Sequence, residues 1–138
     1  MTQSATITPL RALSYGILLA HLALVGCSNS DSRPNQIPVF PVEGQLFVGK
    51  KPAGGAIVIF HPSSGGIEFT ATVRDDGRFV PTQSDGAVGL PEGDYSLTAI
   101  WMENKSDLFA GKYADPASPI ATVSVKPGIN FVPPVELP

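Results

Sequence analysis

Glycine and proline interrupt this chain so often that few segments are long enough to form a helix. The 138 residues include 14 glycines and 14 prolines, about a fifth of the chain, and most of them lie beyond residue 30. Glycine and proline are the two residues least favourable inside a helix. The hydrophobic share of 43% nevertheless supports a packed core, and the glycine and proline content stays below that of low-complexity chains. We therefore expect one compact domain made of short extended segments.

Between these interruptions, apolar side chains recur at every second residue, the period of a β-strand with one buried face. Ala56 to Phe60 is apolar at every position and predicts a central strand. The alternating apolar positions assigned to one face of each of the other strands are Phe40, Val42, Leu46 and Val48; Ile67, Phe69, Ala71 and Val73; Tyr95, Leu97, Ala99 and Trp101; and Ala121, Val123 and Val125. Asp75, Asp76 and Gly77 supply a hairpin turn signal, after which Phe79 and Val80 form the return strand.

Seven short strands separated by turn residues predict an all-β fold, specifically a single antiparallel seven-stranded β-sandwich. The seventh strand, from Phe131 to Leu137, contains Pro133 and Pro134, which lack the N–H that a strand ladder needs. We therefore expect this strand to lie at an edge or to be broken. Met102 to Ala110 contains neither glycine nor proline, and the pattern leaves a single helical turn and an irregular loop both open.

The amino-terminal region has the pattern of a secretory signal. Ala12 to Val25 is mostly apolar, follows Arg11 and is shorter than the roughly 20 residues that a membrane-spanning helix needs. Leu24, Val25, Gly26 and Cys27 resemble the lipobox of bacterial lipoproteins, and Cys27 is the only cysteine. The resemblance implies that residues 1–26 are a cleaved signal peptide and that Cys27 is the lipid attachment site. The expected partner is thus a lipid bilayer, reached through acylated Cys27.

Residues 27–38 form the second predicted segment, which consists of the lipidated cysteine and a flexible tether rich in Ser, Asn and Asp. Residues 39–138 form the β-sandwich domain. Ser28 directly after the cysteine is similar to the pattern for sorting to the outer membrane in cells with two membranes. We therefore expect a lipid-anchored, extracytoplasmic protein of the cell membrane or outer membrane.

A second resemblance covers residues from about 40 to 137. Residues 42–62, the turn at 74–79 and the segment Leu90-Pro-Glu-Gly-Asp-Tyr-Ser-Leu97 resemble carboxypeptidase regulatory-like domains, and residues 112–130 resemble small bacterial lipoproteins with this transthyretin-like sandwich. These motifs are turns and core positions, so the resemblance implies a fold, transthyretin-like or immunoglobulin-like, rather than an activity.

Charge and composition argue against several classes of function. Nine Lys and Arg residues and twelve Asp and Glu residues are spread without runs, which gives no basic surface for nucleic acid. Asp75, Asp76 and Asp85 are interpreted as turn residues rather than calcium ligands. The sequence predicts no catalytic residue, no metal site and no cofactor. His61, the one histidine beyond the predicted signal, lies at a strand end without a motif that positions a partner for it.

Aromatic side chains offer the remaining candidate for ligand binding. Trp101 and Tyr113 are the side chains on which a sugar ring would stack, although the alternation places Trp101 on the core face. The sequence thus predicts a non-enzymatic structural or interaction module of the cell envelope, with an unidentified protein or glycan partner. The alternatives are a carbohydrate-binding module that uses Trp101 and Tyr113, and a hydrolase that uses His61.

Overall fold

The structure, a computed structural model, describes residues 37–138, which belong to one compact unit. These residues form strands, turns and loops, so the predicted all-β class is confirmed for this part of the chain. The predicted signal peptide, Leu24 to Cys27 and the tether up to residue 36 lie outside the described residues. The strands expected from the alternation are divided into thirteen segments within residues 37–138 and assigned to several sheets.

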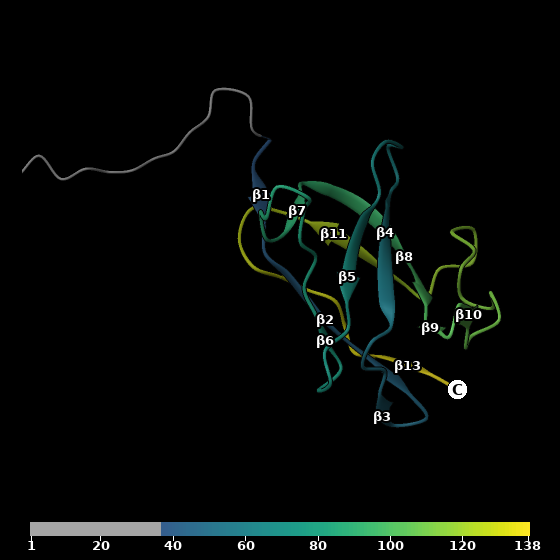
Figure 1. Cartoon of the computed structure of the whole chain (residues 1–138). Coiled ribbons are helices and arrows are strands. Elements are labelled where there is room, and N and C mark those ends of the chain that lie inside the picture. Colours follow the sequence, from purple (N-terminus) through teal and green to yellow (C-terminus); the bar gives the residue numbers. More distant parts are fainter. Residues whose placement is uncertain (1–36) are drawn as a thin grey trace, which may run out of the picture. The chain divides into compact units, whose positions relative to one another are not determined.

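The first sheet has four antiparallel strands (Figure 1). Its order is β11 (Ala121–Val125), β8 (Gly93–Ile100), β4 (Ile57–Pro62) and β5 (Phe69–Thr72). β4 lies between two partners, with Val58 opposite both Ala71 and Ala99, so the predicted central strand is confirmed. Ile67 does not continue the buried face of β5: the strand begins at Phe69, and the Ile67 side chain is exposed.

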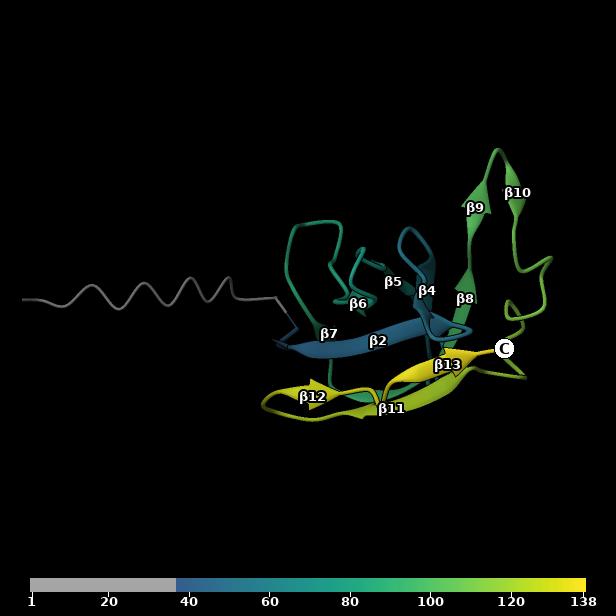
Figure 2. The same ribbon diagram turned by 90° about the horizontal axis from the view of Figure 1, so that it is seen from below.

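The second sheet is built around β2 (Val42–Val48), in which Val42 and Leu46 are buried and Glu43 is exposed, as the alternation predicts. One edge pairs with β6 (Arg78–Phe79) and β3 (Lys51–Pro52), both antiparallel. Along the other edge, β12 (Asn130–Phe131) and β13 (Val135–Leu137) run parallel to β2 (Figure 2). The expectation of a purely antiparallel arrangement is therefore wrong at these two pairs. The turn after β11 returns the chain to the start of β2, so the next strand must run in the same direction as β2.

The last strand is broken, as the two prolines predict. Pro133 and Pro134 separate β12 from β13, because neither residue can donate to the ladder with β2. Two small pairs complete the topology: β1 (Val39–Phe40) with β7 (Leu90–Pro91), and β9 (Met102–Glu103) with β10 (Ser106–Asp107). β9 and β10 form a hairpin in the segment that the sequence left open between a helical turn and a loop.

The two main sheets share one hydrophobic core. It includes Val42 and Leu46 of β2, Val58 and Phe60 of β4, and Leu97 of β8, all fully buried. The rings of Phe60 and Phe79 meet edge to face at 6.1 Å and connect the first sheet with the second. Each such side chain contributes about 1.5–3 kcal/mol when removed from water. The arrangement of several sheets around a common interior is consistent with a β-sandwich, but not with a single seven-stranded one.

Candidate functional site

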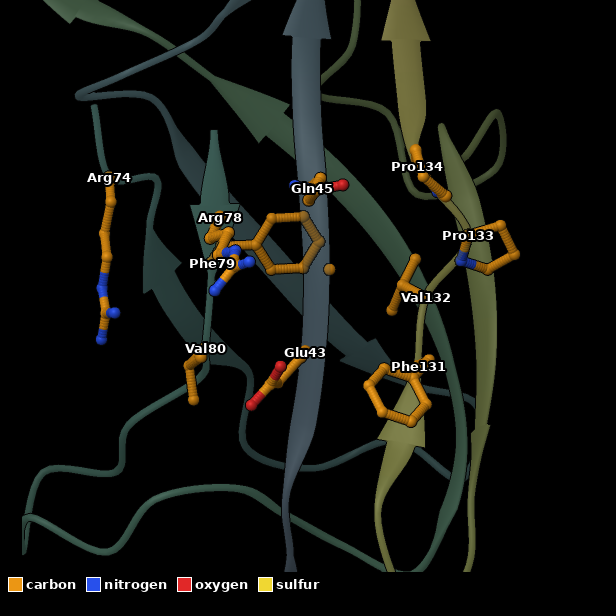
Figure 3. Close-up of a pocket in the computed structure, with 11 residues that line it drawn as sticks. Glu43, Gln45, Arg74, Arg78, Phe79, Val80, Phe131, Val132, Pro133 and Pro134 are labelled. Carbon is orange, nitrogen blue, oxygen red and sulfur yellow. The ribbon is translucent and has the colours of Figure 1, made fainter. Parts of the chain in front are cut away.

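A groove of about 440 Å³ crosses the outer side of the second sheet (Figure 3). Glu43 and Gln45 of β2 form its floor. The wall on the β6 side carries Arg74 and Arg78, and the wall on the β12 side carries Phe131. The complete lining consists of Glu43, Gly44, Gln45, Arg74, Arg78, Phe79, Val80, Phe131, Val132, Pro133 and Pro134.

The local sequence explains the two walls. Gly44 pairs with Phe79, and a Cβ at residue 44 would lie 2.2 Å from the Phe79 ring, so the missing side chain leaves room for that ring to reach the core. Arg78, the neighbour of Phe79 on a strand, consequently points to the outer side. On the opposite wall, Phe131 is 68% exposed although its neighbour Val132 is buried. Phe131 and the two prolines that follow it thus form an apolar wall, which faces the cationic wall of Arg74 and Arg78.

The charged groups of the groove are weakly paired. The Arg78 guanidinium lies 3.8 Å from the Asp76 carboxylate, and both side chains are largely exposed. Surface pairs of this kind contribute at most about 1 kcal/mol. Within residues 37–138, the Arg74 and Glu43 side chains have no ion pair. The guanidinium groups therefore remain accessible to a ligand. An anionic ligand group would have to replace only the weak ion pair between Arg78 and Asp76.

This groove was not predicted from the sequence. Its arginines flank the Asp75 to Gly77 turn, and its aromatic wall lies in the strand that the two prolines predict to be at an edge or broken. The sequence held one signal for the groove: Phe131 is followed closely by Pro133 and Pro134. Prolines are not expected in a central, buried strand. The sequence could not show that Phe131 lies across the groove from Arg74 and Arg78. This arrangement depends on β12 joining the sheet of β2 rather than the sheet of β11.

Trp101 and Tyr113, the predicted ligand platform, are brought together through Phe109. The Trp101 and Phe109 ring centroids are 5.7 Å apart, and those of Phe109 and Tyr113 are 5.1 Å apart. Both predicted residues are partly buried against the core, and the Lys112 ammonium lies 4.9 Å from the centroid of the Tyr113 ring. The three rings thus pack against one another and against the end of the sandwich, which leaves less ring surface for a sugar than two open platforms would have.

The hydroxyl of Tyr113 is buried and has no hydrogen-bond partner among residues 37–138. An unsatisfied buried hydroxyl destabilises the folded state by about 1–3 kcal/mol. We therefore expect the Tyr113→Phe variant to be as stable as the parent chain or up to about 1 kcal/mol more stable, as measured by urea denaturation. A clear loss of stability would contradict the unpaired state of this hydroxyl.

Asp107 organises the loop that holds these aromatic residues. Its carboxylate accepts hydrogen bonds from the backbone N–H groups of Trp101 (2.9 Å), Phe109 (3.0 Å) and Gly111 (2.8 Å). The bond from Trp101 is the largest influence, and together these donors hold the pKa of Asp107 below its ordinary value of 3.8. The loop conformation is therefore coupled to the charge of one side chain.

This coupling predicts an acid-sensitive loop. Because the folded state has the lower pKa, Asp107 contributes its full stabilisation above its ordinary value of 3.8. The contribution is lost as the pH falls from there through the depressed pKa of the folded state. Trp101 is the only tryptophan, so its fluorescence reports on this loop. We expect the fluorescence of the parent chain to change below about pH 4, and the Asp107→Asn variant to lose that transition. An identical transition in both chains would contradict the role of Asp107.

His61 has two side-chain partners, contrary to the expectation of an unpartnered imidazole at a strand end. Nδ1 lies 2.8 Å from Glu68 Oε1, and Nε2 lies 2.8 Å from Thr98 Oγ1. Since a carboxylate only accepts, Nδ1 donates to Glu68, and in the tautomer with its proton on Nδ1 the ring accepts the Thr98 hydroxyl at Nε2. This is the order of a nucleophile, base and orienting acid. Thr98, however, is fully buried, so a substrate carbonyl cannot reach its hydroxyl in this conformation.

The aspartates that were weighed as calcium ligands act in turns. Asp76 accepts a hydrogen bond from the Arg78 N–H at 3.0 Å, and Asp85 accepts one from the Ala87 N–H at 2.9 Å. Both bonds connect a side chain with the backbone two residues later, which is the pattern that stabilises tight turns. The interpretation of Asp76 and Asp85 as turn residues is thus confirmed. Residues 37–138 contain no group of three or more His, Cys, Asp or Glu residues suited to hold a metal ion.

Three comparisons with known proteins were made, against family models, curated proteins and solved structures. No protein-family model matches the chain, and no curated protein matches it. Among solved structures, it is similar to a DUF3823 family protein from Parabacteroides merdae, with 18% sequence identity and a TM-score of 0.42. That match covers 73% of this chain and 46% of the other, so the chain spans less than half the length of that protein. Across residues 37–138, no helix has the length and apolar character needed to cross a membrane.

Proposed function

We propose that this protein is a lipid-anchored, extracytoplasmic interaction module of the cell envelope that works without catalysis. Its domain is a β-sandwich of the transthyretin-like, carboxypeptidase regulatory-like type. The groove over β2 is the recognition surface. The observation that carries this conclusion is the exposed Phe131 ring opposite Arg78, which is weakly paired, and Arg74, which has no ion pair within residues 37–138. Aromatic and arginine side chains dominate the energetics of protein interfaces, because both combine a large contact surface with directed polar groups.

The groove favours a protein segment over a single small molecule. It is open, and its polar groups lie along its length instead of converging on one point. An extended segment with an acidic group toward Arg74 and an apolar side chain toward Phe131 would match both walls. This assignment places ligand recognition on β2 and its neighbours rather than on Trp101 and Tyr113, whose rings pack against Phe109.

Membrane attachment is attributed to Cys27. The lipobox resemblance implies that the Cys27 thiol carries diacylglycerol and that the new amino terminus is acylated. Two or more acyl chains hold a protein stably at the membrane, whereas a single chain leaves it exchanging. We expect the intact mass of the membrane-associated protein to correspond to residues 27–138 plus acyl chains. The Cys27→Ser variant should remain an unmodified precursor. An uncleaved, unmodified mass for the parent chain would refute the anchor.

The recognition surface is tested separately by site-specific photocrosslinking in native membranes. A photoreactive residue in place of Phe131 should give a discrete adduct, because this position borders the groove. The same residue in place of Met102 is the control, since Met102 is also exposed but lies on the β9 hairpin, outside the groove. The adduct at 131 should weaken when Arg74 and Arg78 are both changed to alanine. No adduct at 131, or the same adducts at both positions, would contradict the assignment.

A further inference from the structure

Three segments far apart in sequence meet around the backbone of Phe40 and Pro41. The N–H of Asn130 donates to the Pro41 carbonyl at 2.9 Å. Gly89 packs so tightly there that a Cβ would lie 2.3 Å from the Phe40 carbonyl oxygen. The chain from Ile37, the loop before β7 and the turn before β12 therefore converge at the start of β2 (Figure 2).

Each of the three segments presents one exposed aliphatic side chain at this point. Ile37 is 72% exposed, Val88 is 52% exposed and Ile129 is 67% exposed. Ile37 is three residues before Phe40, and Val88 and Ile129 directly precede Gly89 and Asn130, the two residues that contact Phe40 and Pro41. Exposed aliphatic residues occurring singly are ordinary, but here three are carried by segments whose backbones meet at the start of β2, which favours a common contact surface. We call Ile37, Val88 and Ile129 the aliphatic end of the domain.

The aliphatic end is also where the chain enters the domain. Only residues 28–36 separate Ile37 from Cys27, and the chain between these two residues can span at most about 35 Å. If Cys27 is acylated, this end of the sandwich is therefore held within about 35 Å of the bilayer surface. β9 and β10 lie at the far side of the molecule from β1 in both views (Figures 1 and 2).

We infer that the aliphatic end inserts into the bilayer interface, so that the domain rests on the membrane in a fixed orientation. This inference rests on the proposed lipid anchor. The three segments, residues 37–43, 83–92 and 126–131, carry one cation, Lys126, and three carboxylates, Glu43, Asp85 and Glu92. With this balance of charge the contact is apolar, and attraction to anionic lipid does not contribute to it. In this orientation the groove opens beside the membrane surface, because Phe131 is two residues beyond Ile129.

Cysteine chemistry provides a direct test in the full lipidated protein. Acylation consumes the Cys27 thiol, so an Ile129→Cys variant has a single free thiol for an environment-sensitive fluorophore. In phosphatidylcholine vesicles, the label at 129 should shift to shorter wavelengths and be quenched by lipids with a spin label near the headgroup. The matched control is Met102→Cys, an exposed residue on the β9 hairpin. Its label should stay water-exposed and unquenched.

The outcomes separate this inference from the proposed anchor. Equal, water-like emission from both labels on membrane-bound protein would overturn the insertion while leaving the anchor intact. Quenching at 129 that required anionic lipid would also overturn the apolar contact. A chain without an introduced cysteine that still reacts with the fluorophore would show a free Cys27 and refute the anchor itself. Changing both Ile37 and Val88 to serine should lower the ratio of inserted to free domain by roughly tenfold or more.

Discussion

Replacing Gly89 with alanine is expected to destabilise the domain by at least about 3 kcal/mol, enough to lower Tm by more than about 10 °C. Two effects combine at this residue. Its φ of +117° lies in a region that residues with a side chain rarely adopt, and the new Cβ would lie 2.3 Å from the Phe40 carbonyl oxygen. Both atoms of this contact belong to the backbone or are attached to it directly, so no side-chain rotation relieves it. The pairing of β1 with β7 must shift.

Gly86→Ala is the matched control, because Gly86 belongs to the same loop and has a φ of +87°. A Cβ there meets nothing within 4 Å. This variant therefore carries the conformational strain alone, about 1–2 kcal/mol. Thermal denaturation of both variants separates the two effects. Equal losses of stability would mean that the close approach of Gly89 to Phe40 contributes nothing and that the three segments do not meet as described.

At the turn from Asp75 to Gly77, the sequence predicted the turn itself but not the partners of the strands on either side. The turn itself forms as predicted: the Gly77 N–H donates to the Arg74 carbonyl at 2.9 Å, and Gly77 has a φ of +86°. The strands on either side then separate, since β5 pairs with β4 and β6 pairs with β2. Turn chemistry is local and visible in the sequence. The choice of sheet depends on Phe79 packing against Gly44, a contact between residues 35 positions apart.

His61 illustrates the same limit for a polar site. The sequence marks it as the one histidine beyond the predicted signal but gives no partner for it. Its register opposite Ser96 in β8 brings Thr98, two residues further on, to the same side of the sheet, and Glu68 approaches from the segment before β5. Strand alternation predicted many of the side chains that enter the core, although it wrongly included Ile67. It could not predict which side chains on the opposite face of the sheet become neighbours, because that depends on the order of the strands.

The Gly44→Ala variant is expected to lose about 3 kcal/mol of stability through a clash within the core. Gly44 has no strained backbone angle, so the effect is one of space: its Cβ would lie 2.2 Å from the tip of the Phe79 ring. The far end of an exposed side chain would move aside at little cost. Phe79 cannot, because its ring is fully buried and packs edge to face against Phe60, the contact that joins the two sheets.

A second substitution identifies the ring as the cause. Phe79→Leu alone should cost about 1–2 kcal/mol, since leucine keeps most of the buried apolar volume. In the double variant the shorter leucine leaves room for the alanine Cβ, so its loss should fall below the sum of the single losses by at least about 1 kcal/mol. Urea denaturation of the four chains measures this coupling. Additive losses would show that Phe79 does not lie over Gly44. Coupled losses would establish the contact that turns β6 toward β2 and thereby sets Arg78 on the wall of the groove.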